Sequence, residues 1–358
     1  MDLLTPLYGP ERQHPHFVSL IHPHVGRRYA RNELLRWLDG FPNRDRKFIE
    51  EFQITFNSSF WEIYLHAVFC EYGFGFDWRY HAPDFMLSTP ACTFAVEAVT
   101  ANHANDATPE WAGKWTPEFF DNVEFNELNR VAIIRLANAF ISKSRLFQDK
   151  YAKHAHVQGR PFVLAMAPFE QPGFNLQAYR AIEALLFDYY VDEEEYLANP
   201  DAFPYGPEGR SLGSVEKDNG AEIELGLFNS PKFKHVSAVV FSNLATWGKV
   251  EAMSGNPDAM VSSVRSTPDG MVRKVAPASE ASEAITDGLR VYHNPFATHP
   301  LPKEVFRRDG VVQMWADLEE QALVSEQAET CLQSRSVFIA LRCAPDDPMW
   351  NEVQEDDS

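Results

Sequence analysis

The chain has 358 residues, of which 45% are hydrophobic, and a formal net charge of −19. This much apolar material can form a sizeable core in one large domain or two smaller ones, whereas the acidic balance argues against a general nucleic-acid coat. No stretch approaches the roughly 20 apolar residues that span a bilayer, and the N-terminus lacks the pattern of a secretory signal. We therefore expect a soluble protein of the cytoplasm.

The first 25 residues are rich in proline and contain two His-Pro-His sequences, His14–His16 and His22–His24. Such histidine pairs could chelate a metal, although an irregular proline-containing loop is the simpler interpretation. Amphipathic patterns then predict helices over Arg27–Leu38 and from Asp45 to Phe52. We interpret residues 1–55 as a helical N-terminal extension.

The segment Ser58–Tyr72 is a stronger helix candidate, because apolar residues nearly surround it and leave one polar stripe that contains Glu62. Three short extended segments follow, at Phe76–Tyr80, Pro83–Leu87 and Thr93–Thr100. The third, TFAVEAVT, is the clearest strand, since it is β-branched and apolar with a single carboxylate, Glu97, in its middle.

Thr116 followed by Pro117 is a good helix start and predicts a long helix that runs to about Lys153. An apolar strand over Phe162–Met166 and a helix from Leu176 to Tyr190 come next. Three hairpin-like strands, followed by a helical crossover to a fourth, predict an α/β fold with a mixed central sheet flanked by helices.

The later segments could extend this sheet or build a small C-terminal subdomain. A hairpin is expected over Ser262–Val275, turning at Pro268–Asp269–Gly270. Further strands are expected at His235–Ser242, Leu289–His293, Val311–Trp315 and Ser336–Arg342. We divide this part of the chain into a core over 56–245, a C-terminal elaboration over 246–345 and an acidic tail over 346–358, which we expect to be disordered.

Two carboxylates of the expected strands are candidates for chemistry. Asp84 opens one extended segment and Glu97 lies on the next, and antiparallel neighbours of this length can bring them together. A carboxylate on a buried strand costs several kcal/mol unless it is paired or bound to a cation. A hard divalent ion such as Mg²⁺ suits oxygen ligands of this kind. The simpler interpretations are a turn at Asp84 and a structural ion pair at Glu97.

The helix FWEIYLHAVF, the segment HAPDF and the strand FAVEAV, in this order between Phe60 and Met166, together resemble the PD-(D/E)xK superfamily of nucleases. The resemblance implies a restriction-endonuclease-like core that hydrolyses phosphodiester bonds with Mg²⁺ or Mn²⁺, with DNA as the favoured substrate. It also implies that Asp84 and Glu97 bind the metal and that Glu62 assists them.

The sequence departs from the family where a lysine usually stands, because Val99 occupies the position two residues after Glu97, on the same face of the strand. Some members of the superfamily carry the basic group on the following helix, where ISKSRLFQDKY offers Lys143 and Lys150. Lys143 is favoured because it lies in the middle of that helix. The resemblance then gives Lys143 the stabilisation of developing charge, and it gives contacts with the nucleic-acid backbone to three residues. These are Arg145, Lys150 and Tyr151.

Other functions stay open at this point. Val99 is compatible with a nuclease-like fold that has lost its lysine and only binds nucleic acid or a protein partner. A carboxylate-pair glycosidase is a third possibility, although no barrel-like βα repeat is present. The chain contains no GxxxxGK[ST], GxGxxG, GxSxG or HExxH motif. Metal dependence would separate these functions, and a homodimer or a partner protein is compatible with each of them.

Overall fold

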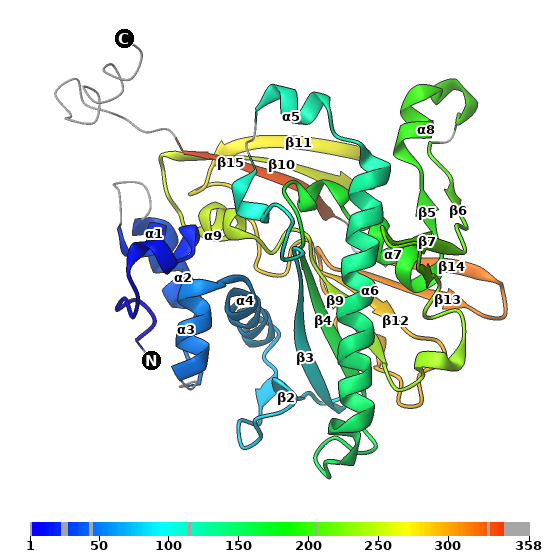
Figure 1. Ribbon diagram of the computed structural model, residues 1–358, viewed down its shortest axis with the longest axis horizontal. Coiled ribbons are helices and arrows are strands. Elements are labelled where there is room, and N and C mark those ends of the chain that lie inside the picture. Colours follow the sequence, from blue (N-terminus) through cyan, green and yellow to red (C-terminus); the bar gives the residue numbers. More distant parts are fainter. Residues whose placement is uncertain are drawn as a thin grey trace.

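The computed structural model describes residues 2–22, 28–42, 46–113, 116–204, 206–327 and 330–339. They form a mixed α/β fold in which a large sheet lies between two layers of helices (Figure 1). The predicted class, a mixed central sheet flanked by helices, is therefore confirmed. His24 and the acidic tail over 346–358, both discussed above, lie outside the described residues.

The large sheet has eight strands in the order β1-β2-β3-β4-β9-β12-β13-β14. Its central strands β3, β4 and β9 are parallel, whereas β2 pairs with β3 and β12 pairs with β9 in the antiparallel sense. The strand bounds are β1 (Gly75–Phe76), β2 (Phe85–Ser88), β3 (Thr93–Asn102), β4 (Phe162–Phe169), β9 (Ala238–Phe241), β12 (Arg290–His293), β13 (Val312–Asp317) and β14 (Ala322–Gln327).

A separate hydrophobic core forms on each face of this sheet. Side chains of β3 alternate between the two cores, with Phe94 and Val96 on one face and Ala95 and Val99 on the other. The first core is completed by α1 (Pro15–Ile21), α2 (Arg28–Trp37), α3 (Arg46–Ile54), α4 (Asn57–Glu71) and α9 (Trp247–Met253). The second is completed by α6 (Phe125–Asp149) and α7 (Arg180–Phe187). Because both faces are covered, β4 is buried along its whole length.

The single long helix predicted over 116–153 is wrong. The chain forms a short α5 (Pro117–Asp121), then α6, and then a 3₁₀ helix η3 (Tyr151–Lys153). The backbone amide of Asn126 donates to a carboxylate oxygen of Glu194, a residue of α8 (Glu193–Ala198), at 2.9 Å. This contact satisfies one of the free amides of the first turn of α6, so a distant part of the chain fixes where the helix begins.

The described residues between 246 and 339 form both of the arrangements that the sequence left open. Strands β12, β13 and β14 extend the large sheet, and a three-stranded sheet forms from β11 (Gly270–Pro277), β10 (Ala259–Thr267) and β15 (Cys331–Ile339). The predicted hairpin is confirmed, with Thr267 facing Gly270 across its turn. Sequence patterns missed the short pairs β5 (Tyr190–Val191) with β6 (Gly209–Arg210) and β7 (Ser214–Glu216) with β8 (Glu222–Glu224). Within the described ranges, no helix has both the length and the apolar character needed to cross a bilayer.

The edge between β2 and β3 shapes the candidate site. Strand β2 pairs with β3 only between Thr93 and Val96, whereas β4 accompanies β3 on its other side as far as Asn102. The second half of β3 is therefore open on the β2 side, and Glu97 is its first residue. Backbone groups on that side need partners other than a neighbouring strand.

Candidate active site

Glu97 and Lys143 form the centre of the site. Glu97 lies in the middle of β3 and shares the side-chain parity of Ala95 and Val99, so it points to the face that α6 covers. Its side chain is only 3% exposed, and its Oε1 atom lies 2.6 Å from Nζ of Lys143 on α6. The side chain of Lys143 is 30% exposed. Helix α6 thus brings a lysine to the strand carboxylate, on the same face of β3 as Val99, which occupies the position where the family usually has its lysine.

Asp84 reaches the same place from the chain just before β2. Its Oδ2 atom accepts a hydrogen bond from the backbone amide of Ala98 at 2.8 Å. That amide lies in the half of β3 that β2 leaves open, so Asp84 supplies the partner that the missing strand does not. The structure therefore brings Asp84 next to Glu97, as the sequence spacing predicts.

Tyr151 and Glu62 complete the group. The hydroxyl of Tyr151 on η3 donates to Oε1 of Glu97 at 3.3 Å. Glu62 is a partly buried residue of α4, and its charge acts on Lys143. Residues from α4, the β2–β3 edge, α6 and η3 thus converge, and Tyr151 contacts the strand carboxylate rather than a separate backbone-binding surface.

The other two predicted binding residues lie elsewhere. Lys150 is exposed at the end of α6. Arg145 follows Lys143 by two positions, which corresponds to about 200° around a helix, and it lines a pocket on the other side of α6 from Glu97. Arg145 therefore does not join the site, because the helical period turns it away.

Burial and charge determine the protonation of the central pair. Burial, followed by repulsion from Asp84, raises the pKa of Glu97, and the attraction of Lys143 only partly offsets this. Burial alone would lower the pKa of Lys143, but the carboxylates of Glu97, Asp84 and Glu62 outweigh it, so the net shift of the Lys143 pKa is upward. The ammonium group of Lys143 therefore stays charged, and the neighbouring Glu97 carboxyl group loses its proton at a higher pH than an exposed glutamate does.

A histidine clamp, which sequence reasoning missed, connects the two chain segments that carry Asp84 and Tyr151. Nε2 of His156 donates to the carbonyl oxygen of Ala82 at 2.9 Å. Its ring stacks on that of Tyr80, with centroids 3.7 Å apart and planes at 9°. The segment that leads to Asp84 is thereby fastened to the segment that follows η3. The sequence signal was the His-x-His pair His154 and His156, whose spacing does not by itself point to Ala82 or Tyr80.

Asp84 and Glu97 are the carboxylates that a divalent cation could use as ligands. Among the described residues, no three His, Cys, Asp or Glu side chains gather closely enough to hold a metal ion. Mg²⁺, however, is commonly bound through one or two carboxylates, with waters and substrate phosphates as the remaining ligands. Asp84 and Glu97 offer such a pair, and Oε2 of Glu97 is buried without a hydrogen-bond partner. The oxygen donors present therefore fit a hard divalent cation that is shared with a substrate phosphate.

The His-Pro-His sequence at His14–His16 has a structural role in the fold. Nδ1 of His14 accepts a hydrogen bond from the backbone amide of His16 and caps α1. The His14 ring is buried against Phe56, with centroids 5.2 Å apart, and against Trp111, with centroids 4.2 Å apart. This motif is therefore accounted for by capping and packing.

Two other buried carboxyl groups, Glu110 and Glu170, lack a lysine partner such as the one that Glu97 has. Burial raises the pKa of Glu110 to about 7, and Nδ2 of Asn57 donates to its Oε1 atom at 2.7 Å. Burial likewise raises the pKa of Glu170, just after β4, to about 7, and the side-chain amides of Gln171 and Gln177 donate to it. Both carboxyl groups are held by neutral amides, which is the arrangement of a structural group.

The raised pKa of Glu170 predicts a pH dependence of stability. Its folded value is about 7 against an ordinary 4.5, so the folded chain keeps a proton that the unfolded chain releases between these values. The free energy of unfolding should therefore fall as the pH rises through this range and stay level above it. Glu170→Gln should remove this pH-dependent part of the free energy of unfolding, which amounts to at most about 3 kcal/mol across the range. Urea unfolding of both proteins at a series of pH values measures it, and a difference between them that is the same at every pH would contradict the assignment.

The comparisons with known proteins add no relative to this geometry: no protein-family model, no curated protein and no solved structure matches the chain.

Proposed function

We propose that this chain is a metal-dependent nuclease that hydrolyses phosphodiester bonds, with DNA as the favoured substrate and Mg²⁺ or Mn²⁺ as the cofactor. One observation carries the proposal. Lys143 lies 2.6 Å from Glu97, while Asp84 is hydrogen-bonded to the amide of the residue that follows Glu97. Two carboxylates and a lysine at one open strand edge are the groups that metal-assisted phosphodiester cleavage requires.

The arrangement of elements supports a restriction-endonuclease-like core. A helix that carries Glu62 precedes three strands that form an antiparallel meander, and a long helix then crosses to β4, which lies parallel to β3. This order matches the one on which the resemblance to PD-(D/E)xK nucleases depends. Fold likeness alone does not assign a function, so the weight of the proposal rests on the site residues.

The residues of the site can be given roles. Asp84 and Glu97 would hold the cation, which when bound polarises the scissile phosphate and lowers the pKa of a bound water. Lys143 would stabilise the negative charge that develops on the phosphate oxygens. Tyr151 holds Oε1 of Glu97 in place, and Glu62 helps to keep Lys143 charged.

Exposed cations near the end of α6 support a polyanionic substrate. Lys150 and Lys153 are exposed and form no ion pair within the part of the chain that the structure describes. They lie directly before and at the end of η3, the element that carries Tyr151. Phosphate contacts from such lysines would give affinity without sequence specificity and would weaken as the salt concentration rises.

The test is cleavage of plasmid DNA, single-stranded DNA and RNA by the full chain with Mg²⁺, with Mn²⁺ and with EDTA. We expect cutting of at least one DNA substrate that needs either metal, stops in EDTA and returns when metal is added in excess. Cutting that continues in EDTA would contradict a metal-dependent site.

A second function, an inactive nuclease-like binding module, is favoured by Val99, which stands at the usual lysine position. In that case a well-folded protein would retain nucleic acid or a partner protein in a binding assay but would cleave no substrate with either metal.

A further inference from the structure

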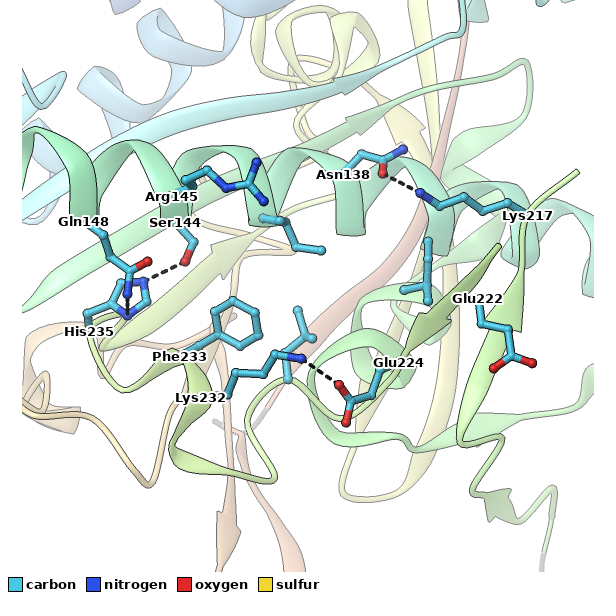
Figure 2. A pocket seen from close by; sticks show the side chains of 13 residues that line it. Asn138, Ser144, Arg145, Gln148, Lys217, Glu222, Glu224, Lys232, Phe233 and His235 are labelled. Atoms are coloured by element: carbon cyan, nitrogen blue, oxygen red, sulfur yellow. Dashed lines mark hydrogen bonds and ion pairs between the residues drawn. The ribbon is translucent and has the colours of Figure 1, made fainter. Parts of the chain in front are cut away.

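A separate pocket is lined along one side by α6 (Figure 2). Its lining residues Ser144 and Arg145 lie about 100° and 200° around the helix from Lys143, the residue that contacts Glu97. Its volume is about 570 Å³, and its walls come from α6, β8 and the chain around the 3₁₀ helix η6 (Pro231–Phe233). This volume falls within the range of about 300–1,000 Å³ that small-molecule sites in proteins occupy. The nuclease site does not use any of the side chains that line it.

Three side chains form a connected polar group at one end of the pocket. Oγ of Ser144 lies 2.6 Å from Nε2 of His235, and the side-chain amide nitrogen of Gln148 lies 3.3 Å from Nδ1 of the same ring. Ser144 is only 2% exposed, whereas Gln148 is exposed. With the amide donating to Nδ1, Nε2 carries the ring hydrogen and donates to Ser144. The hydroxyl of Ser144 then has its own hydrogen to donate to a ligand.

Arg145 supplies charge next to this group. Its side chain is exposed, lines the pocket and makes no hydrogen bond or ion pair within the described part of the chain. The other cations of the lining are already engaged, since Nζ of Lys232 lies 2.7 Å from Glu224 and Nζ of Lys217 lies 3.2 Å from Asn138. A guanidinium group beside a hydroxyl donor is suited to a carboxylate or phosphate, because all of these donors can point to one anionic group.

The middle of the pocket is apolar. Ile141 of α6, Ile223 of β8 and Phe233 of η6 line it, and the Phe233 ring packs against His235 with centroids 6.2 Å apart. Figure 2 shows Gln148, Ser144 and His235 together at one end of the pocket and Glu222 at the other. A ligand with an anionic group at the first end could therefore lay an apolar body along Phe233 while it stays clear of the Glu222 carboxylate.

We propose that this pocket binds a small molecule that joins an anionic group, a phosphate or a carboxylate, to an apolar ring or chain. The anionic group contacts Arg145 and Ser144, and the apolar body packs on Phe233. The site is distinct from the nuclease site, so the proposal stands whether or not the chain cleaves nucleic acid.

The test is calorimetric titration of the full chain with phenyl phosphate and with benzoate, and with inorganic phosphate and benzyl alcohol as partial probes. We expect phenyl phosphate, benzoate or both to bind more tightly than either partial probe. Arg145→Gln should weaken that binding about tenfold or more, because it removes a charge-assisted contact. Ser144→Ala should weaken it to a smaller extent. Arg273→Gln, which changes an exposed arginine of β11, is the matched control and should leave binding unchanged.

Each outcome bears on the proposal. Binding of phenyl phosphate alone or of benzoate alone supports it and identifies the anion. The proposal is overturned if neither compound binds the unaltered chain, or if Arg145→Gln binds as well as the unaltered chain does. It is also overturned if inorganic phosphate binds as tightly as phenyl phosphate, since the apolar wall would then have no part in binding.

Discussion

Glu97→Gln should reduce the rate of metal-dependent cleavage by about 10³-fold, because a lost metal ligand removes several kcal/mol of transition-state stabilisation and each ~1.4 kcal/mol is a factor of ten. The substitution keeps the shape of a side chain that is 3% exposed and removes only its charge. Because burial raises the pKa of Glu97, a neutral group suits this position, and the variant should stay folded. Plasmid cleavage in Mn²⁺ measures the rate, and urea unfolding measures the stability.

The matched control is Glu170→Gln, the same substitution at another buried carboxyl group beside the central strands. It should leave the cleavage rate within about threefold of the unaltered chain, since a change of that size is well under 1 kcal/mol. If Glu97→Gln cut DNA as fast as Glu170→Gln, Glu97 would have no part in the chemistry and the proposed site would be wrong.

Lys143→Met should lower the cleavage rate by about 100-fold, because it removes a preorganised positive charge from the place where negative charge develops. It should also raise the pKa of Glu97 further, since Lys143 now lowers that pKa. Metal binding requires the deprotonated carboxylate, so the binding of Mn²⁺ should weaken at neutral pH and recover as the pH rises. Cleavage should not recover to the same extent, because the lost charge is not replaced.

Two further variants separate catalysis from folding. Lys143→Arg keeps a cation and should restore part of the activity, although its planar group does not reproduce the position of Nζ. Lys47→Met removes an exposed lysine of α3 and should leave cleavage unchanged. If Lys143→Met lost stability and activity together, and Lys143→Arg restored both, Lys143 would be a structural partner of Glu97 rather than a catalytic group.

Local patterns predicted most of the central fold. The apolar run of β4, the single carboxylate within β3 and the apolar surround of α4 are all visible in short windows, because burial on two faces leaves few polar residues. The turn before Gly270 was also visible locally, because a proline, an aspartate and a glycine in succession favour a tight turn. The start of α6 depends on a contact with a distant segment, and strands β5 to β8 are too short to show a hydrophobic pattern, so they left no comparable signal.

The amino-acid sequence alone was enough to identify which residues could form a site. Glu97 was recognisable because a carboxylate on an apolar strand needs a partner. Asp84 was recognisable because it opens the preceding extended segment, and Lys143 because the family resemblance and its position in the middle of the helix favoured it. The tertiary structure alone decided which of them meet. Strand β2 begins only at Phe85, opposite Val96, and this late start opens the edge that Asp84 fills. The helical period of α6 turns Lys143 toward Glu97 and Arg145 toward the separate pocket. The His156 clamp and the Ser144–His235 pair have sequence separations of 74 and 91 residues. Contacts of that kind are set by the packing of whole layers, which no local pattern records.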